Sequence, residues 1–335
     1  MFEVELNAPL NVEWEITSAC NLRCRHCYVS AGARLPEELT TEEALKLIGE
    51  LDEIGISDIT LSGGEPFLRK DIWLIIDELH KRQIPFTIYT NATLLDAEVV
   101  EKLVNRKVKS ISVSLNGATA ETHNFVQNAS TFNLVLKAIK LLKENNIKVQ
   151  VLFTLMKINA KETDDLIKLT RELDVDSLCI YPFYPAGRGR ENLQYLELDA
   201  KIARDILTEA VQKNNGKPPT IYVGGCLSRH FSPTKKHSLI KGAPCAKLMA
   251  LVTADGHLRP CNFLPFRTRH GVKEKKIAEL WNEPLFENIR DWNKSAPPEC
   301  SNCEHIHLCF SSCLSMHLDM LDSNFKATLE SLADK

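Results

Sequence analysis

Strand-like and helix-like segments alternate along the first two thirds of the chain. Short runs of β-branched and apolar residues, typical of buried strands, are each followed by a longer segment whose apolar residues recur every three or four positions, as on one face of a helix. Six strands are expected, at residues 12–16, 58–62, 86–90, 110–115, 148–155 and 177–182. Helices are expected from the capping box Thr40–Glu43 onward and at residues 71–81, 96–105, 131–145, 161–173 and 199–213.

Six β/α units in succession predict an α/β protein with a parallel sheet and helices outside it. The number of units fits an open, partial (β/α)6 barrel, in which chemistry gathers at the C-terminal ends of the strands. Polar residues, glycines and a proline do follow these strand ends: Cys20, Gly63 to Pro66, Asn91, Ser114 with Asn116, and Pro182. We therefore expect the functional site on that side of the sheet.

The β/α rhythm stops after a short apolar run at residues 220–223, and cysteines return from Gly224 onward. This change predicts two domains: a partial barrel at residues 1–223 and a small cysteine-rich domain at residues 224–335.

The composition narrows the class of protein. The chain has 335 residues, of which 44% are hydrophobic and 25% charged, as in soluble globular proteins. A net charge of −3 gives no reason to expect a nucleic-acid partner, and no apolar run is long enough to span a membrane. The N-terminus lacks the basic start and apolar core of a signal peptide. Eleven cysteines without an export signal indicate a reducing cytoplasm and metal ligation.

Three cysteines near the N-terminus, Cys20, Cys24 and Cys27, have the spacing C-x3-C-x2-C. Three thiolates this close can hold three irons of a 4Fe-4S cluster and leave the fourth iron open to a small molecule, which can then receive an electron. A structural zinc site needs four ligands, and only His26 lies nearby, so zinc with a distant fourth ligand is the alternative. An odd number of cysteines and the absence of an export signal disfavour a disulfide.

Together with Tyr28 and the run Leu61–Pro66 (Leu-Ser-Gly-Gly-Glu-Pro), this cysteine motif resembles the radical S-adenosylmethionine (SAM) superfamily. The resemblance extends over nearly the whole chain. It implies that the open iron chelates the amino and carboxylate groups of SAM, and that an electron from the cluster cleaves SAM to a 5′-deoxyadenosyl radical. It also implies that Tyr28 lies against the adenine, and that the SAM amino group is received by Gly63, Gly64, Glu65 and Pro66, with Glu65 as its charge partner.

Three further stretches resemble motifs of the same family, with departures. Thr90-Asn91-Ala92 is similar to its Thr-Asn-Gly turn, and residues 112–117, which include Ser114, are similar to its Ser-x-Asp-Gly turn, with Asn116 in place of Asp. Residues 123–127 resemble a His-Asp-x-x-Arg stretch in which Asn124 and Gln127 replace the charged residues. Because both changes remove charge, the expectation that this loop contacts SAM or substrate is weakened. We interpret His123 as a structural hydrogen-bonding residue.

Two arginines, Arg188 and Arg190, follow the sixth strand and are expected over the barrel mouth. There they either contact the SAM carboxylate or substrate, or cap an acidic surface.

A second set of cysteines resembles the SPASM extension of radical SAM enzymes, whose members modify peptides or small precursors and carry up to two auxiliary iron–sulfur clusters. By that resemblance the nearer cluster takes Cys245, Cys261 and Cys313, and the farther one takes Cys300, Cys303 and Cys309. The family's seventh cysteine is missing after Cys313. Candidate fourth ligands are Cys226 or a substrate for the nearer cluster, and His317, Asp319 or Asp322 for the farther one. There are two alternatives to a pair of auxiliary clusters: only one auxiliary cluster assembles, or Cys300 and Cys303 belong to a zinc ribbon.

Two cysteines stay outside these sets. Cys179 lies in an apolar strand and is interpreted as a buried packing residue. Cys226, after Gly224-Gly225, is a metal ligand, a hydrogen-atom donor to a substrate radical, or a plain thiol.

The sequence thus predicts a radical SAM enzyme that abstracts a hydrogen atom from a ribosomally made peptide, leading to a crosslink, an oxidation or an epimerisation. Only nineteen residues precede Cys20, too few for a leader-binding domain, so either a separate protein recognises the leader or the substrate is small. Oxidation or decarboxylation of a tetrapyrrole side chain, as in haem-pathway relatives, is the second hypothesis. The expected reductant is a flavodoxin or ferredoxin. A non-catalytic iron–sulfur carrier or a zinc-bound interaction protein represents a different class.

Overall fold

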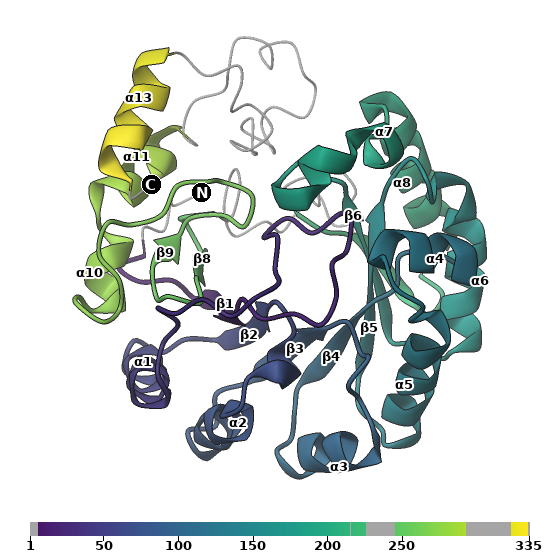
Figure 1. The fold of residues 1–335 in the computed structure, drawn as a ribbon, viewed down its shortest axis with the longest axis horizontal. Coiled ribbons are helices and arrows are strands. Elements are labelled where there is room, and N and C mark those ends of the chain that lie inside the picture. Colours follow the sequence, from purple (N-terminus) through teal and green to yellow (C-terminus); the bar gives the residue numbers. More distant parts are fainter. Residues whose placement is uncertain (1–5, 215, 226–244, 293–322, 334–335) are drawn as a thin grey trace.

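A single curved sheet organises the chain. The computed structural model describes residues 6–214, 216–225, 245–292 and 323–333. Nine strands of these residues pair in the order β7-β6-β5-β4-β3-β2-β1-β8-β9 (Figure 1). Every neighbouring pair is parallel except β8 and β9. The strands are β1 Asn11–Thr17, β2 Asp58–Gly63, β3 Phe86–Thr90, β4 Ser110–Ser114, β5 Val149–Leu155, β6 Ser177–Pro182, β7 Thr220–Val223, β8 Met249–Val252 and β9 Leu258–Arg259.

Helices cover the outer side of this curved sheet (Figure 1). The helices of the described residues are α1 Thr41–Glu53, α2 Ile72–Lys81, α3 Ala97–Asn105, α4 Ala120–Gln127, α5 Phe132–Glu144, α6 Thr163–Glu172, α7 Leu193–Leu196, α8 Ala200–Asn214, α10 Ile277–Trp281, α11 Pro284–Trp292 and α13 Ser323–Leu332, and α11 and α13 lie beyond the β9 end of the sheet. Short 3-10 helices occupy Pro66–Leu68, Ala160–Glu162 and Gly187–Asn192. The predicted capping box begins α1: the Thr40 side chain accepts from the Glu43 amide at 3.2 Å, and the Glu43 carboxylate accepts from the Thr40 amide at 2.8 Å.

The six β/α units and the α/β class are confirmed, and the sheet is open. It is larger than predicted, because β7 pairs with β6, and β8 pairs with β1 from Asn11↔Met249 to Trp14↔Val252. An unpaired strand edge leaves a row of backbone N–H and C=O groups without hydrogen-bond partners. β8 provides these partners along the free edge of β1. Residues of the predicted second domain therefore extend the first sheet, while the boundary at residue 223 stays a prediction.

The prediction of a loop after the fourth strand is wrong for residues 120–127, which form α4. The Thr119 side chain accepts from the Thr122 amide at the start of this helix, and Asn128, with a φ of 54°, adopts the left-handed conformation that ends it.

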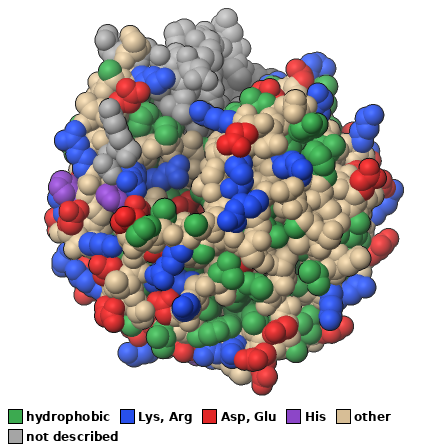
Figure 2. All heavy atoms as spheres, viewed as in Figure 1, with side chains coloured by type: hydrophobic (Ala, Val, Ile, Leu, Met, Phe, Trp, Pro, Cys, Tyr) green, Lys and Arg blue, Asp and Glu red, His purple; other side chains and the backbone are tan. Residues whose placement is uncertain are grey.

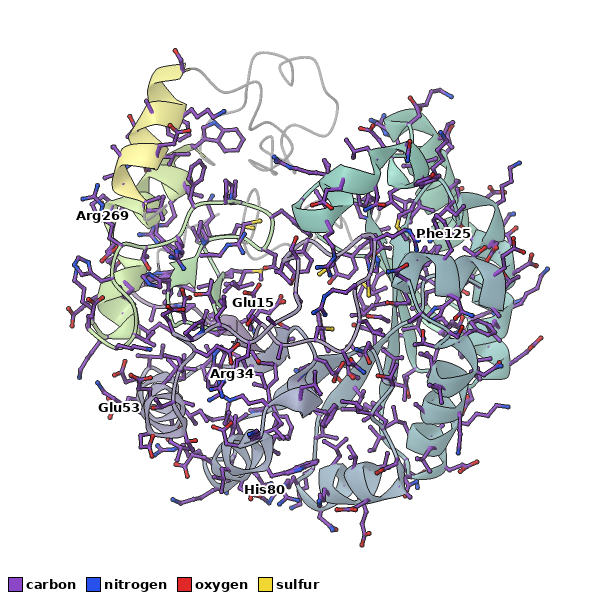
Figure 3. All side chains as sticks on the ribbon, in the orientation of Figure 1. Glu15, Arg34, Glu53, His80, Phe125 and Arg269 are labelled. Carbon is purple, nitrogen blue, oxygen red and sulfur yellow. The ribbon has the colours of Figure 1, made fainter. Side chains whose placement is uncertain are left out.

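The two faces of the sheet differ in polarity. Along β1, Val12, Trp14 and Ile16 are buried among apolar side chains, whereas Glu13 and Glu15 point to the opposite face. Glu15 lies inside the ring of strands in Figure 3, so the second face is the concave one. The interior of an eight-stranded barrel is usually packed with bulky aliphatic side chains. Carboxylates on this concave face are more suited to contact a ligand than to form a core.

The outer surface carries charges of both signs. Acidic and basic side chains are interspersed over the rim of the face drawn in Figure 2. No helix in the described part of the chain combines the length and the apolarity needed to cross a membrane.

Candidate iron–sulfur and SAM site

The three N-terminal cysteines lie on one loop inside the ring of strands. This segment, residues 18–32, is called the cysteine loop below. It is closed at its base by two backbone hydrogen bonds, from the Cys20 amide to the Gly32 carbonyl and from the Gly32 amide to the Ser18 carbonyl, both at 2.9 Å. Cys20, Cys24 and Cys27 are all half-buried free thiols. The loop therefore presents three sulfurs from one short, pinned segment.

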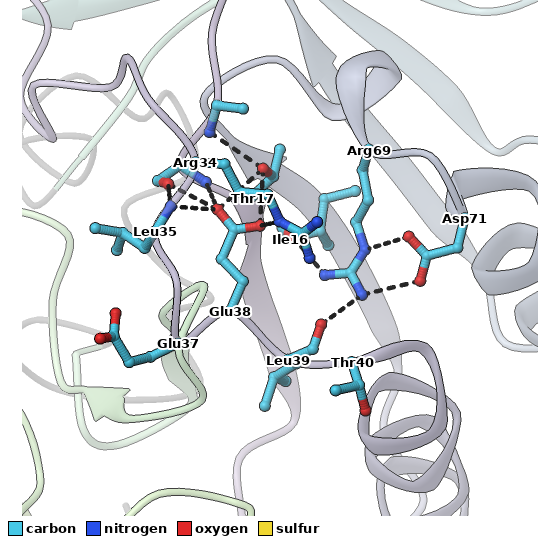
Figure 4. Close-up of polar contacts among 12 residues, drawn as sticks. Ile16, Thr17, Arg34, Leu35, Glu37, Glu38, Leu39, Thr40, Arg69 and Asp71 are labelled. Atoms are coloured by element: carbon cyan, nitrogen blue, oxygen red, sulfur yellow. Dashed lines mark hydrogen bonds and ion pairs between the residues drawn. The ribbon is translucent and has the colours of Figure 1, made fainter.

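Glu38 holds the start of the cysteine loop (Figure 4). This buried carboxylate accepts hydrogen bonds from the Ser18 amide and hydroxyl, both at 2.7 Å, from the Thr17 hydroxyl at 3.1 Å, and from Arg34 Nε at 3.0 Å. Burial alone would raise the pKa of Glu38, but the hydrogen bonds from Ser18, Thr17 and Leu35 outweigh it and keep the pKa below its ordinary value. Glu38 is therefore ionised at neutral pH and fixes the turn that leads into Cys20.

Arg69 adds a second buried anchor beside it (Figure 4). Its guanidinium donates to the Ile16 carbonyl at 2.5 Å and the Leu39 carbonyl at 2.9 Å, and it forms a two-point ion pair with Asp71 at 2.9 and 3.1 Å. The Arg69 guanidinium therefore connects the end of β1 to the segment that precedes α1. Neither Glu38 nor Arg69 is marked by a sequence motif, because a charged residue before a helix ordinarily faces solvent.

Arg188 holds the cysteine loop from the opposite side. Its guanidinium donates to the Cys24 carbonyl at 3.1 Å and to the Ala31 carbonyl at 2.9 Å. A Cβ on the neighbouring Gly187, whose φ is 50°, would lie 2.4 Å from the Tyr28 carbonyl oxygen, so this close packing requires glycine. Arg190 is exposed and donates to the Pro185 carbonyl at 2.7 Å. The contacts of Arg188 are thus with the loop, and its contact with SAM stays a prediction.

The glycine pair packs against the same loop. The Gly64 amide donates to the Thr17 carbonyl at 2.7 Å, and the Glu65 amide donates to the Ala19 carbonyl at 2.8 Å. A Cβ on Gly63, whose φ is 119°, would lie 2.3 Å from the Thr17 carbonyl oxygen, and one on Gly64 would lie 2.0 Å from that of Ala19. The glycines therefore allow the end of β2 to lie directly against the segment that carries Cys20.

Replacing Gly64 with alanine is expected to destabilise the protein and to lower its iron content, because the clashing atoms are backbone atoms that cannot rotate away. A loss of roughly 3 kcal/mol or more in the free energy of unfolding is expected for such strain. Urea denaturation and iron analysis measure both effects. Gly49→Ala in α1 is the matched control, because its Cβ would find no atom closer than 3.6 Å; equal behaviour of the two variants would contradict the packing argument.

Glu65 links the ends of β2 and β3. It is fully buried, and its carboxylate accepts from the Thr90 hydroxyl at 2.8 Å and from the Asn91 amide at 2.8 Å. Burial raises the pKa of Glu65 to about 7, although these hydrogen bonds oppose the shift. Pro66 begins the 3-10 helix that follows, and Ser114 is half-buried at the end of β4. The assignment of these residues to SAM stays a prediction.

The chemistry of the three thiols fits a cluster. The Cys20 sulfur accepts from the Leu22 amide at 3.4 Å and lies 3.9 Å from Asn91 Nδ2, and such N–H groups stabilise thiolate ligands. Burial raises the pKa of Cys20 and of Cys24; the charges of Glu65 and Cys27 raise that of Cys20 further, and the charges of Cys27 and Cys20 raise that of Cys24. Metal binding displaces these protons. Among the described residues, no three His, Cys, Asp or Glu side chains form a group that could hold a single metal ion.

Two departures from the expected motifs find a structural reason. Asn116 Nδ2 lies 3.4 Å from His26 Nε2 while its Oδ1 accepts from the Thr154 amide at 2.9 Å, so the amide both donates and accepts. Burial lowers the pKa of His26 to about 4, which keeps the imidazole neutral. Gln127 Oε1 lies 2.6 Å from the Cys24 sulfur. His123 is buried and hydrogen-bonded through both ring nitrogens, in agreement with the structural interpretation.

Comparison with known proteins identifies the family. Residues 14–170 match the radical SAM superfamily, and residues 245–304 match the SPASM iron–sulfur cluster-binding domain. An AdoMet-dependent heme synthase of Methanosarcina barkeri is 30% identical to the chain over 322 residues, which are 90% of this chain and 90% of the relative. This chain belongs to the radical SAM superfamily. Membership implies a 4Fe-4S cluster and SAM, and the SPASM domain implies auxiliary iron–sulfur clusters.

Other radical SAM proteins resemble it along most of their length. The mycofactocin maturase MftC of Mycobacterium ulcerans is 27% identical over 324 residues, covering 94% of this chain and 85% of the relative. SuiB of Streptococcus suis bound to S-adenosylmethionine has the same fold, with a TM-score of 0.77 at 18% identity over 94% of this chain and 75% of SuiB. The structure of SuiB bound to its precursor peptide SuiA gives a TM-score of 0.76 at 17% identity over 99% and 77% of the two chains.

The described part of the SPASM region in this radical SAM protein contains two of the predicted auxiliary ligands. Cys245 and Cys261 are both buried. Cys245 forms an isolated bridge to Met249, the first residue of β8, and Cys261 follows two residues after the end of β9. Cys226, Cys300, Cys303, Cys309, Cys313, His317, Asp319 and Asp322 lie outside the described residues.

Aromatic contacts join the two cysteine-bearing regions. The ring of Tyr28, directly after Cys27, contacts Phe263 edge-on at 5.4 Å, and Phe263 stacks on Tyr184 at 4.1 Å. The Phe263 amide also donates to the Cys261 sulfur at 3.4 Å. The contact of Tyr28 with adenine stays a prediction, and its contact with the SPASM region is an addition from the structure. Cys179 is buried in β6, with its pKa raised to about 12 by burial, as expected for a packing residue.

Proposed function

We propose that this protein uses SAM to generate a 5′-deoxyadenosyl radical that abstracts a hydrogen atom from a peptide. The observation that carries the proposal is the convergence of Cys20, Cys24 and Cys27 on one loop that is fixed by the Gly63–Gly64 turn. When bound, the cluster supplies the electron that cleaves SAM. The protein's own residues orient the three thiolates, and Asn91 and Gln127 contact two of the sulfurs.

A peptide substrate is supported by the relatives and by the concave face of the sheet. SuiB, which shares the fold, has been solved with its precursor peptide SuiA bound, and a mycofactocin maturase is among the similar proteins. The buried Glu13 and Glu15 on this face disfavour an anionic ligand. The proposal includes a barrel at residues 1–223, an auxiliary-cluster domain at residues 224–335, a cytoplasmic location, a flavodoxin or ferredoxin as reductant, and a separate protein for leader recognition.

A tetrapyrrole substrate is the second candidate, and the 30% identity to an AdoMet-dependent heme synthase favours it. The carboxylate side chains of a tetrapyrrole would have to bind away from Glu13 and Glu15, or pair with the guanidinium of Arg259. The oxidised or decarboxylated side chain would then be the site of hydrogen abstraction.

An anaerobic assay tests both candidates. Reconstituted protein with dithionite and SAM is expected to form 5′-deoxyadenosine slowly, and about tenfold faster or more when the substrate is present. One arm adds a synthetic peptide encoded next to the gene, and the other adds iron-coproporphyrin III. Mass spectrometry of each additive detects hydrogen loss. No 5′-deoxyadenosine in any arm would rule out radical SAM chemistry, and acceleration by the porphyrin alone would replace the peptide hypothesis.

A further inference from the structure

Two glutamates side by side on β1 have unequal surroundings. Glu13 and Glu15 occupy alternate positions of the strand and both are more than nine-tenths buried. Glu13 accepts hydrogen bonds from Ser62 Oγ at 2.9 Å, Asn262 Nδ2 at 2.7 Å and the Tyr28 hydroxyl at 3.4 Å. Its carboxylate is thus satisfied by the protein itself.

Glu15 has no such partners. Its Oε1 is shielded from solvent and accepts no hydrogen bond from any residue in the described part of the chain. A buried carboxylate oxygen without a donor is costly, so such a group in a folded protein requires an explanation, of which a missing ligand is one. Neighbouring Glu13 shows that this face can supply hydrogen-bond donors to a carboxylate, whereas Glu15 Oε1 receives none from the described residues.

The charges around Glu15 add up to an excess of negative charge. Burial raises the pKa of Glu15 to about 7, Arg259 opposes this shift, and Glu13 and Asp255 add to it. Asp255 is already paired with Arg267 at 2.5 Å. The guanidinium of Arg259 donates to the carbonyls of Asn262 and Leu264 and forms no ion pair with Glu15. Among the described residues, Arg259 is thus the one cation that offsets the charge of Glu13 and Glu15 when both are ionised, and its guanidinium is itself hydrogen-bonded to backbone carbonyls.

The position of Glu15 places it next to the radical SAM site. It precedes Cys20 by five residues on the strand that leads into the cysteine loop, and a Cβ on Gly63 would lie 3.2 Å from its Cα. Arg259, two residues before Cys261, approaches it from the SPASM region. Figure 3 shows Glu15 inside the ring of strands, whereas Glu53 lies on the outer helix α1.

We propose that Glu15 is a substrate-binding residue that accepts a hydrogen bond from a cationic nitrogen of the substrate, such as a lysine ammonium, an arginine guanidinium or a peptide N-terminus. This inference rests on the proposed function and specifies the chemistry of its substrate. A cationic N–H donor supplies both what Oε1 lacks and the charge that the site lacks, whereas a carboxylate or phosphate supplies neither. The amino group of SAM is also a cationic N–H donor, so the test must distinguish binding of Glu15 to the substrate from binding of Glu15 to SAM.

Two matched peptides test the proposal on the anaerobically reconstituted full chain. Acetylated and amidated Ala-Gly-Lys-Gly-Ala is compared with the same peptide carrying norleucine in place of lysine, and their dissociation constants are measured by calorimetry in the presence of SAM. The wild type is expected to bind the lysine peptide about tenfold more tightly, as for one charge-assisted hydrogen bond. Glu15→Gln is expected to lose this preference, and Glu53→Gln, which removes an equal charge from the surface, to retain it.

SAM binding is measured in parallel by the change that SAM causes in the electron paramagnetic resonance spectrum of the reduced protein. An unchanged SAM affinity in Glu15→Gln supports the proposal, and a loss of about tenfold or more would assign Glu15 to SAM and overturn it. Equal binding of both peptides, no binding at millimolar concentration, or a lysine preference that survives in Glu15→Gln would also overturn it. Formation of 5′-deoxyadenosine by the wild type in any of these cases would leave the proposed function standing.

Discussion

Replacing Cys24 with alanine is expected to abolish the formation of 5′-deoxyadenosine. The three thiols share one loop, so the loss of one leaves a cluster iron without its ligand. No described side chain beside Cys24 can replace it, because His26 Nε2 faces Asn116 and Gln127 offers only an amide. Even outer-shell changes at metal sites cost 10- to 100-fold, so a loss above about 100-fold is expected for a ligand. Chromatography of the SAM products measures it.

The control variant is Cys179→Ala. Cys179 is buried in β6, away from the cysteine loop in sequence, and has no assigned ligand role. This variant is expected to keep both 5′-deoxyadenosine formation and the iron of the first site. Iron and sulfide analysis of Cys24→Ala would then show a loss of about four irons per chain relative to Cys179→Ala. Undiminished 5′-deoxyadenosine formation by Cys24→Ala would refute the assignment of the cluster.

Local patterns were sufficient to predict the repeating units. β3 and β6 begin and end at the predicted residues, and α1 begins at the predicted capping box, because periodicity and capping are encoded within a few neighbouring residues. The additions to the sheet could not be predicted in the same way. The pairing of β8 with β1 joins residues more than two hundred positions apart, and nothing in the short runs of β8 and β9 indicates their partner.

Only those residues of the candidate site that belong to sequence motifs could be predicted. The cysteines and glycines have characteristic spacings, but Glu38, Arg69 and Glu15 are ordinary charged residues whose burial arises only from tertiary packing. Along β1 there was one available signal: two glutamates alternate with Val12, Trp14 and Ile16, a pattern that places acids on one face of a central strand.

Glu13 shows how the two cysteine-bearing regions are connected. Its carboxylate accepts from Tyr28, the residue after Cys27, and from Asn262, the residue after Cys261. The Tyr28–Phe263 contact runs beside these hydrogen bonds. A few short contacts therefore connect the two cysteine-bearing regions directly.

Replacing Glu38 with alanine is expected to have the second large effect, on stability and on iron content together. The substitution leaves the half-buried Ser18 amide and hydroxyl and the buried Thr17 hydroxyl without their shared acceptor. A hydrogen bond to a charged group contributes roughly 1.5–3 kcal/mol, so the loss of several such bonds is expected to lower the free energy of unfolding by about 3 kcal/mol. Since the freed turn leads directly into Cys20, the first cluster is expected to assemble incompletely.

Glu37→Ala is the matched control, because this neighbouring side chain is exposed and makes none of these contacts (Figure 4). Urea denaturation measures the free energy of unfolding of both variants, and iron analysis after reconstitution measures cluster assembly. Because the pKa of Glu38 is lowered in the folded protein, its contribution is complete above the ordinary value of 4.5 and decreases as the pH falls through the lowered pKa. The gap between wild type and Glu38→Ala is therefore expected to narrow in acid. A gap that is constant with pH, or equal iron contents in the two variants, would show that Glu38 does not hold the cysteine loop through its charge.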